Sequence, residues 1–300
     1  MRAVRYHDFG DAEVMRVEEA PEVHAGPGQI RIAVRSTSVN PADLKFRAGL
    51  LQDYRPTTFP AIPGMDAAGI VDEIGAGVTG LAVGDRVLGL TATGGAAEHA
   101  VLKAWAPLPQ RWSFAHGAAA GITGHTVLLA LDALGPLSGR AFLVEGAAGG
   151  VGTAAVELAA DRGATVIGTA SEHNHEFLRS LGAIPTIYGD GLPQRVAALA
   201  PDGVAAVLDT VGSGSLGDLI AIAGDAAAVV TLADYSGPER GVRLVGGEEN
   251  MQENLAALAA AGERGTFTPQ ISVELPLEDI VQAHQHVAGG HTRGKVVLAL

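Results

Sequence analysis

The sequence predicts an α/β protein with two parts: an antiparallel, partly barrel-like β domain and a doubly wound parallel sheet. In residues 1–114, apolar and polar residues alternate in short runs that Gly and Pro separate, as in half-buried strands. In residues 115–265, short and fully apolar runs alternate with helical runs, which indicates a parallel sheet covered on both faces. Residues 266–300 return to the texture of the first part, so the chain is expected to re-enter the first domain.

Strands are expected in the first part wherever the alternation lasts for several residues, because successive side chains of a strand point to opposite faces. Turns rich in Gly and Pro separate these runs, as in GAGVTGLAVGD at residues 75–85. The last part is expected to add a strand, a helix and a final strand. The expected strands are 1–7, 29–40, 67–75, 85–90, 271–276 and 294–300.

The second part begins with a long helical run at residues 115–135, which ends at a Gly. After it, apolar runs of strand length alternate with runs of helical periodicity, and several helices end at a Gly, which is typical of a C-terminal cap. The expected strands are 139–146, 164–170, 184–189, 203–212 and 226–234, and the expected helices are 151–163, 174–183, 192–201 and 216–224.

Composition excludes several classes of function. The formal net charge is −13 for 300 residues, which argues against a nucleic-acid or anionic-membrane partner, because both need a basic face. The chain has no Cys, so it has neither disulfides nor Cys-ligated zinc. Its N-terminus is mixed and charged, unlike a signal peptide, and no uninterrupted apolar run has the length of a membrane span. We therefore expect a cytoplasmic protein.

The stretch GAAGGVG, residues 146–152, lies between an expected strand and an expected helix. In a βαβ unit, glycines at this turn allow a tight bend, close approach to a pyrophosphate and close helix packing, while the helix N-terminus attracts the phosphates. The pattern G-x-G-x-x-G fits with Ala in its first position. A tight turn without a ligand is the alternative. The expected cofactor contacts are Ala147, Ala148, Gly149, Gly150 and Val151.

The end of the next expected strand favours NADPH as the dinucleotide. A site for NAD usually has an acidic residue there to bind the ribose hydroxyls, whereas this chain has Ser171, which can donate to a 2′-phosphate. The adjacent Glu172 counts against this reading, and helix capping is an alternative role for Ser171. Further donors follow closely: His173, Asn174, His175 and Arg179, of which Asn174 is taken as a cofactor contact.

Motifs along the whole chain resemble the zinc-free quinone oxidoreductase branch of the medium-chain dehydrogenase/reductase superfamily. The segments that carry the resemblance include SVNPADLKFRAG, FPAIPGMDAAGIV, GITGHTVLLAL, VEGAAGGVGTAAVELA, VLDTVG and HTRGKVVL, in the family's order. The resemblance implies a GroES-like catalytic domain, split between residues 1–114 and 266–300, around a Rossmann domain at 115–265. It also implies a homodimer that pairs Rossmann-sheet edges.

The resemblance implies that no catalytic zinc is bound. Zinc-dependent relatives bind this ion through Cys, His and Cys, and the corresponding positions here are Asn40, Met65 and approximately Ala119. These residues are poor ligands for zinc. The His-containing stretches 173–175 and 283–286 have spacings that can suit a metal, but a surface helix explains them equally well.

The resemblance places Asn40 and Lys45 beside the nicotinamide as catalytic residues. Asn40 is expected to donate to the substrate oxygen, with a turn residue before Pro41 as the alternative. Lys45 stands where Tyr is frequent in the branch, and is expected to hold the ribose or a developing enolate; a solvated lysine is the alternative. The resemblance also implies that Thr123 contacts the cofactor, with helix capping as the alternative, and that Tyr188, one residue early relative to the family's Tyr, flanks the adenosine phosphate. The backbones of Thr231 and Leu232, at the carboxyl edge of the expected sheet, are expected to hold the carboxamide, with a plain strand end as the alternative, whereas Asp209 is taken as structural.

These expectations favour NADPH-dependent reduction of quinones or α,β-unsaturated carbonyls. Without a metal to polarise a carbonyl, the chemistry suits acceptors that are already electrophilic, and the protein supplies orientation and exclusion of water. Two alternatives remain open: an enoyl-thioester reductase, and a non-catalytic NADPH-binding protein. The residue patterns expected to line the substrate pocket do not specify a particular substrate.

Overall fold

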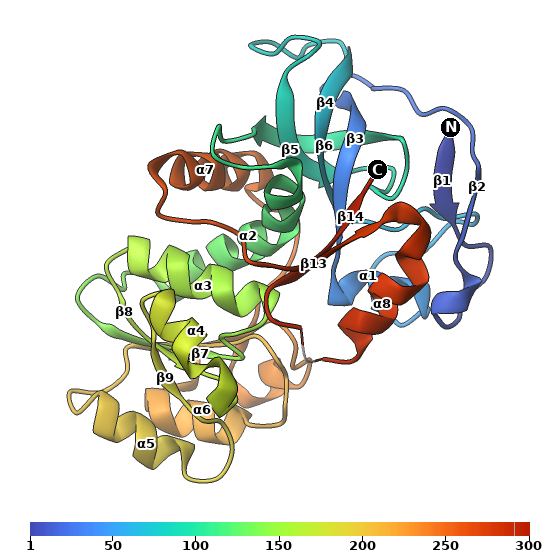
Figure 1. Ribbon diagram of the computed structural model, residues 1–300. Helices are drawn as coiled ribbons and strands as arrows, with labels where there is room; N and C mark the ends of the chain where they lie inside the picture. The colour runs from blue at the N-terminus through green and yellow to red at the C-terminus, as the bar shows by residue number, and fades with distance from the viewer. Residues whose placement is uncertain (291) are drawn as a thin grey trace. The chain divides into compact units, whose positions relative to one another are not determined.

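The computed structural model describes residues 1–290 and 292–300, which form two compact units. Unit 1 comprises Met1–Ile122 and Met251–Leu300, and unit 2 comprises Thr123–Asn250. In Figure 1 the segment from blue to green at the start of the chain and the orange-red to red segment at its end build unit 1, while the green to orange segment between them builds unit 2.

Unit 1 is built on a six-stranded sheet with the order β13-β14-β3-β4-β5-β6. All pairs are antiparallel except β13 with β14, and β3 also pairs with β6, which bends part of the sheet into a barrel. A separate two-stranded antiparallel sheet joins β1 and β2. The strands are β1 (Arg2–Arg5), β2 (Arg16–Glu19), β3 (Ile30–Val39), β4 (Asp66–Ile74), β5 (Arg86–Thr91), β6 (His99–Pro107), β13 (Ile271–Pro276) and β14 (Lys295–Ala299).

Alternation along β3 accounts for one face of the barrel core. Ile30, Ile32 and Val34 are buried, while the residues between them are only partly buried, as the alternating sequence predicts. These three side chains pack in one cluster with apolar residues of β4, β5 and β6. The helices of unit 1 are α1 (Pro41–Arg47), α7 (Met251–Arg264), α8 (Ile280–Ala288) and the first turns of α2 (Phe114–Leu134).

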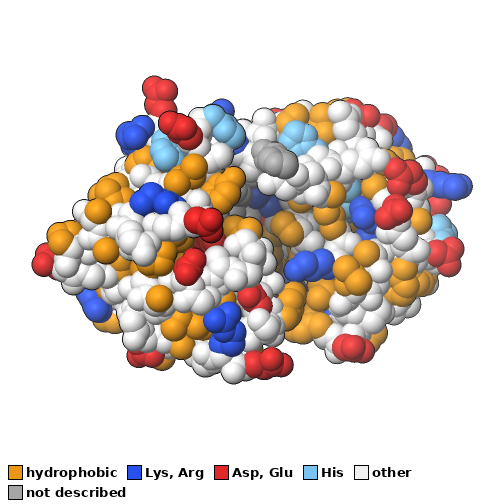
Figure 2. Space-filling view, turned by 90° about the horizontal axis from the view of Figure 1, so that it is seen from below, with side chains coloured by type: hydrophobic (Ala, Val, Ile, Leu, Met, Phe, Trp, Pro, Cys, Tyr) orange, Lys and Arg blue, Asp and Glu red, His pale blue; other side chains and the backbone are white. Residues whose placement is uncertain are grey.

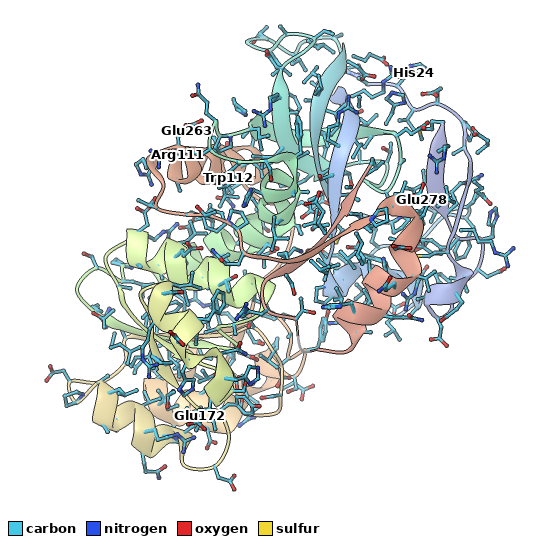
Figure 3. All side chains as sticks on the ribbon, viewed as in Figure 1. His24, Arg111, Trp112, Glu172, Glu263 and Glu278 are labelled. Carbon is cyan, nitrogen blue, oxygen red and sulfur yellow. The ribbon has the colours of Figure 1, made fainter. Side chains whose placement is uncertain are left out.

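The position of α7 differs from the sequence-based boundary, which assigned residues up to 265 to the Rossmann domain. In the structure α7 belongs to unit 1 and packs against β6. Its Leu255 and Leu258 are fully buried, and Gly262 approaches Trp112 so closely that a Cβ would lie 2.6 Å from the ring. Figure 3 shows Arg111 and Trp112 beside this helix, with Glu263 on it. Residues 251–264 are not among the helices expected from the sequence, and the β6 strand that α7 packs against comes from a distant part of the chain.

Unit 2 is a six-stranded, fully parallel sheet with the order β12-β11-β10-β7-β8-β9. This is the doubly wound order, and the direction of winding reverses between β7 and β10. The expected α/β fold with a Rossmann sheet is therefore confirmed. The strands are β7 (Ala141–Glu145), β8 (Thr165–Thr169), β9 (Ile184–Thr186), β10 (Ala206–Asp209), β11 (Val229–Thr231) and β12 (Arg243–Leu244), with helices α3 (Gly150–Asp161), α4 (His175–Ser180), α5 (Leu192–Leu199) and α6 (Leu216–Ala223).

Helix α2 is apolar along its whole length. Among the described residues it alone has a window long and apolar enough to cross a membrane, although 72% of that window is buried inside the protein. Burial of this kind is typical of a core helix.

On the face shown in Figure 2, the Lys and Arg side chains of the described residues lie apart from one another and do not merge into a continuous basic patch.

Candidate functional site

The glycine-rich turn follows β7 directly and is tied to the next strand. The backbone N–H of Gly146 donates to Thr169 Oγ1 at 3.1 Å, and the N–H of Ala147 donates to the Thr169 carbonyl at 3.0 Å. Gly146 has φ +76°, and a Cβ there would lie 2.3 Å from the Val211 side chain. The bend therefore requires Gly at this position, one residue before the Ala that occupies the first place of the motif.

The next glycines serve two different purposes. A Cβ at Gly152 would lie 2.1 Å from the Gly146 carbonyl oxygen, so this Gly permits the contact between α3 and the turn. Gly149 is the N-cap of α3, and a Cβ there would meet only the Gly146 oxygen at 3.5 Å. A single carbon would thus fit at the N-cap of the 12-residue helix α3, whose first N–H groups lack partners within the helix. Of the expected contacts, Ala148, Gly149, Gly150 and Val151 are partly exposed, while Ala147 is buried.

At the end of β8, the structure brings Ser171 and Asn174 together. Asn174 Nδ2 donates to Ser171 Oγ at 3.2 Å, and His173 Nε2 lies 3.4 Å from the same oxygen. Ser171 occupies the N-cap of a short 3-10 helix, but its side chain makes no capping bond. Glu172 is exposed (Figure 3), and within the described chain no hydrogen bond or ion pair is found for the Arg179 guanidinium. Of the expected donors, the structure thus groups Ser171, His173 and Asn174.

Thr123 and Tyr188 are exposed to very different degrees. Thr123 is 2% exposed, and its Oγ1 has no hydrogen-bond partner among the described residues, which is unusual for a buried hydroxyl. Tyr188 is 56% exposed and follows β9 in a loop whose carbonyls receive hydrogen bonds from Arg195. The orphaned Thr123 hydroxyl fits a group that normally contacts a ligand, whereas Tyr188 offers an accessible ring on a fixed loop.

The ends of β10 and β11 are held by a buried carboxylate. Asp209 accepts hydrogen bonds from the N–H groups of Val211 and Gly212, each at 2.8 Å, and from Thr231 Oγ1 at 2.7 Å. These bonds tie the end of β11 and the loop after β10 to the Asp209 carboxylate. The Thr231 carbonyl accepts from Val245, and the Leu232 N–H donates to the Asp209 carbonyl. Of the two backbone groups proposed for a carboxamide, the Leu232 carbonyl is the one without a bond among the described residues.

A second buried carboxylate, missed in the sequence, lies beside Asp209. Glu145 ends β7 and is the register partner of Asp209, so the two acids flank the point where the winding of the sheet reverses. Glu145 is 4% exposed and accepts from Ser215 Oγ at 2.6 Å and from Ser213 Oγ at 3.2 Å. Burial raises the pKa of Glu145, the two serine bonds oppose this, and the Asp209 charge adds to it. Ligands of doubly wound sheets bind at this edge.

In unit 1, Asn40 joins a buried polar network. It follows β3 and is the N-cap of α1, and it is only 5% exposed. Its Nδ2 lies 3.4 Å from both Ser38 Oγ and Asp66 Oδ1, while its Oδ1 accepts a hydrogen bond from Lys295 Nζ. Sequence reasoning named Asn40 but neither Asp66 nor Lys295.

Three ionisable groups of this network are buried. Asp66 accepts from Ser38 Oγ at 2.7 Å and from the Ile122 N–H at 3.0 Å, and Asp43 accepts from the Asn40 N–H at 2.9 Å. Burial raises the pKa of Asp43 to about 6 and also raises the pKa of Asp66. Burial lowers the pKa of Lys295, against the attraction of both carboxylates. Lys45, the other expected catalytic residue, lies on α1 and is partly exposed.

The residues at the expected zinc positions do not fit a catalytic zinc ion. Among the described residues, no three His, Cys, Asp or Glu side chains are grouped so as to hold a metal. Asn40 already receives the Lys295 ammonium on its only side-chain oxygen, and Ala119 is buried with no ligand atom. Zinc needs three or four N, S or carboxylate ligands, which this arrangement does not supply.

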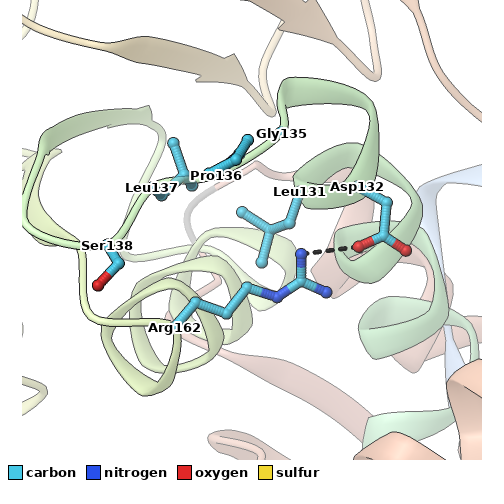
Figure 4. Close-up of a pocket in the computed structure, with 7 residues that line it drawn as sticks. All are labelled: Leu131, Asp132, Gly135, Pro136, Leu137, Ser138 and Arg162. Atoms are coloured by element: carbon cyan, nitrogen blue, oxygen red, sulfur yellow. Dashed lines mark hydrogen bonds and ion pairs between the residues drawn. The ribbon is translucent and has the colours of Figure 1, made fainter.

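A pocket of unit 2 lies at the opposite end of β7 from the glycine-rich turn (Figure 4). It is formed by the end of α2, the loop that enters β7 and the residue that follows α3, with an ion pair between Arg162 and Asp132 at 2.7 Å. These segments are at the amino end of β7, whereas the turn is at its carboxyl end. The lining residues are Leu131, Asp132, Gly135, Pro136, Leu137, Ser138 and Arg162.

Two family models match the chain. One, described as the alcohol dehydrogenase GroES-like domain, matches residues 26–111, and the other, described as zinc-binding dehydrogenase, matches residues 181–298. The quinone oxidoreductase of Rattus norvegicus is 32% identical, with 99% of this chain and 96% of the relative covered. The spectinabilin polyketide synthase system protein NorB of Streptomyces orinoci is 31% identical, with 97% of this chain but 14% of that protein covered.

Solved structures match over the whole length. A mycobacterial protein complexed with NADPH has a TM-score of 0.86 at 26% identity, with 100% of both chains covered. An NAD-dependent alcohol dehydrogenase has a TM-score of 0.87 at 27% identity, again with 100% of both chains covered. The fold is therefore shared by proteins whose names carry either nicotinamide cofactor.

Proposed function

Because the chain belongs to the quinone oxidoreductase branch of the medium-chain dehydrogenase/reductase superfamily, we propose that it reduces quinones or α,β-unsaturated carbonyls with NADPH and without zinc. The family supports an oxidoreductase with a nicotinamide cofactor and a small-molecule substrate. The observation that carries the choice of NADPH is the hydrogen-bonded pair of Ser171 and Asn174, which follows the carboxyl end of β8. The N-terminus of α3 follows the carboxyl end of β7, the neighbouring strand.

In the proposed binding mode, unit 2 holds the cofactor at the carboxyl edge of its sheet. The N–H groups of the first turn of α3 bind the pyrophosphate, with Gly149 leaving room for its approach. Ser171 and Asn174 donate to the 2′-phosphate, where an acidic residue would repel it. The orphaned Thr123 hydroxyl and the Leu232 carbonyl offer a donor and an acceptor to the rest of the cofactor.

In the proposed reaction, the cofactor supplies a hydride and unit 1 stabilises the charge that develops on the substrate oxygen. Asn40 Nδ2 donates to that oxygen in place of its two contacts of 3.4 Å, which are the longest of the network. Lys45 assists by its positive charge. The residues at the zinc positions do not fit a metal ion, so the acceptor must already be electrophilic, as quinones and enones are.

The experiment is steady-state oxidation of NADPH with a panel of 1,4-benzoquinones and enones, with acceptor-free reactions as the background. We expect acceptor-dependent turnover that is faster with NADPH than with NADH. Turnover with neither cofactor across the panel would contradict the reductase and favour a non-catalytic NADPH-binding protein. If NADH is the better donor, only the proposed role of Ser171 and Asn174 is contradicted, and the reductase proposal stands.

Reduction of an enoyl thioester is a second candidate function, favoured by the likeness to a polyketide synthase protein over almost the whole of this chain. The same assay distinguishes the two when a short enoyl thioester, such as crotonyl-N-acetylcysteamine, joins the panel. We expect a lower kcat/KM for this thioester than for 1,4-benzoquinone. The opposite order would make the thioester the preferred class of substrate.

We also propose a cytoplasmic homodimer, for which the support is the family resemblance and the absence of Cys. The edge strand β12 has two residues, Arg243 and Leu244, and both are exposed in the single chain. Sedimentation at micromolar concentration is expected to give twice the chain mass of 30.4 kDa. A mass equal to that of one chain would contradict the dimer.

A further inference from the structure

Hydrogen bonds around Asn40 run in one direction, and Lys295 fixes that direction. The Lys295 ammonium has only donors, so the Asn40 atom that receives its bond must be the oxygen Oδ1. Asn40 Nδ2 therefore faces the other way, toward Ser38 and Asp66. Without a donor on Oδ1, the two ends of an amide are close in shape and the side chain can flip.

The other end of the network supports the same orientation. Asp66 Oδ1 accepts from Ser38 Oγ at 2.7 Å, and Asp66 Oδ2 accepts from the Ile122 N–H at 3.0 Å. Both Asp66 oxygens act as acceptors in these bonds, so Asn40 presents an N–H to Asp66. The Asn40 amide thus has a donor at its oxygen and acceptors at its nitrogen, which polarises it and makes Nδ2 a stronger donor.

Sheet register brings Lys295 to this place. Strand β14 pairs antiparallel with β3, and Val296 is the register partner of Val39. Lys295 precedes Val296 and therefore lies level with Asn40, which follows Val39. Its side chain is buried, and it also donates to the Val39 carbonyl at 3.3 Å. The pairing of the last strand with β3 is thus what orients the amide.

We propose that Lys295 is a positioning residue that acts through Asn40: it holds the amide in one flip state, with Nδ2 as the donor to the substrate oxygen. This inference rests on the proposed function, because it assumes that Asn40 donates in the reaction. The Nδ2 contacts of 3.4 Å are long for hydrogen bonds, so a substrate oxygen can replace one of them at small cost. Lys295 itself does not contact the reacting atoms in this proposal.

The first test reads the amide directly and needs no activity. In a ¹H–¹⁵N spectrum of the full chain, the Asn40 side-chain NH₂ pair is identified as the pair that disappears in Asn40→Leu. We expect Lys295→Met to shift or broaden this pair, because the donor on Oδ1 is lost. The matched control is Lys103→Met on β6, a partly exposed lysine, which is expected to leave the pair unchanged. An unchanged pair in a folded Lys295→Met would overturn the proposal.

The second test is a double-mutant cycle on kcat. We expect Lys295→Met to lower kcat by about tenfold to a hundredfold while KM for NADPH changes by less than about twofold. In the Asn40→Leu background, Lys295→Met is expected to change kcat by less than about twofold, because its effect passes through the missing amide. Effects that simply multiply would show that Lys295 supports the fold and not Asn40, and would overturn the proposal.

The two tests separate failure of this inference from failure of the proposed function. If the wild-type protein turns over no acceptor, the reductase proposal fails, and the amide spectrum alone decides whether Lys295 orients Asn40. If the protein is active, but Lys295→Met leaves the Asn40 amide pair unchanged or the effects of the two substitutions simply multiply, the inference fails and the reductase proposal stands. Should Lys295→Met not fold, Lys295→Gln takes its place: its amide can flip on its own, so the same broadening of the Asn40 pair is expected and its absence counts against the proposal.

Discussion

Ser171 is the residue on which the choice of cofactor depends. Replacing it in Ser171→Asp adds a carboxylate beside Asn174, which repels a 2′-phosphate and accepts from a 2′-hydroxyl. We expect kcat/KM for NADPH to fall by about tenfold or more and the value for NADH to rise, so that the preference reverses. Steady-state kinetics with both cofactors and one quinone measure this.

The matched control is Ser180→Asp at the end of α4, which adds the same charge to the same short helical segment of unit 2. It is expected to leave the NADPH-to-NADH ratio within about twofold, because long-range effects between exposed charges are screened by salt. If Ser171→Asp keeps the wild-type preference, the 2′-phosphate is bound elsewhere.

Sequence distance decides which residues of the site could be predicted. Ser171 and Asn174 are three residues apart, and their joint position follows from the strand end that precedes them. Asn40 and Lys295 are 255 residues apart, and nothing local to either indicates the other. Only the pairing of β14 with β3 brings them together, and strand pairing across a whole chain is not contained in a hydrophobic pattern. Glu145 and Asp209 were missed as a pair for the same reason.

At the scale of the element, two glycines beside the turn before α3 are expected to have different roles: Gly152 in folding and Gly149 in cofactor binding. A Cβ added by Gly152→Ala would meet backbone atoms at 2.1 and 2.6 Å, which cannot move without shifting α3 from the turn. We expect this variant to lower the free energy of unfolding by about 2 kcal/mol. Denaturant titration measures the loss, and a stability equal to that of the wild type would contradict the close packing.

Gly149→Ala is the companion change, with a different expected outcome. Its Cβ would meet only one oxygen, at 3.5 Å, and the backbone at Gly149 has a φ of −74°, which any residue can adopt. Stability is expected to stay within about 0.5 kcal/mol of the wild type. The dissociation constant for NADPH is expected to rise by about tenfold, because the methyl group occupies the space left for the pyrophosphate. Unchanged affinity would place the pyrophosphate elsewhere.

Helix α7 shows what the texture of the chain does not predict at this scale. It is not among the helices expected from the sequence, and in the structure it buries Leu255 and Leu258. The expected boundary at residue 265 groups α7 with the Rossmann domain, because the helix follows the strands of the parallel sheet along the chain, whereas in the structure it belongs to unit 1. Its buried face is completed by Trp112 and β6, which lie about 150 residues earlier.

At the scale of the whole molecule, the two textures of the chain were enough to predict the α/β class and the doubly wound sheet. The apolar strands of unit 2 and the alternating strands of unit 1 follow directly from how many faces of each sheet are covered. The order of strands and the closing pair between β3 and β6 do not follow from texture, since they depend on contacts between distant segments. The same contacts bury ionisable groups and so make the stability of the molecule depend on pH.

Asp43 is expected to make the protein more stable as the pH falls toward about 5. Burial raises its pKa to about 6 in the folded state, above the value of 3.8 for a free side chain, so the folded state binds the proton more tightly. Its contribution to the free energy of unfolding is therefore expected to increase by about 1 kcal/mol between about pH 7 and pH 5. Comparison with Asp43→Asn isolates this term: the stability of the wild type relative to the variant should rise on acidification. A difference that stays constant with pH would show that Asp43 titrates normally.

His284 is expected to act in the opposite direction and to be the larger of the two effects. It is 1% exposed and its Nδ1 accepts a hydrogen bond from Arg47 at 3.0 Å, so protonation would leave two positive groups together; burial and this arginine lower its pKa to about 3. The unfolded chain takes up a proton near the ordinary value of 6.5, which the folded chain cannot do, so stability is lost as the pH falls below that value. Between about pH 7 and pH 5 the expected loss is about 2 kcal/mol.

In His284→Asn, whose side-chain oxygen can still accept from Arg47, this acid sensitivity should disappear, whereas His286→Asn at the exposed position of the same helix should retain it. Denaturant titrations at both pH values measure the difference, and an acid sensitivity that survives in His284→Asn would contradict a neutral buried histidine.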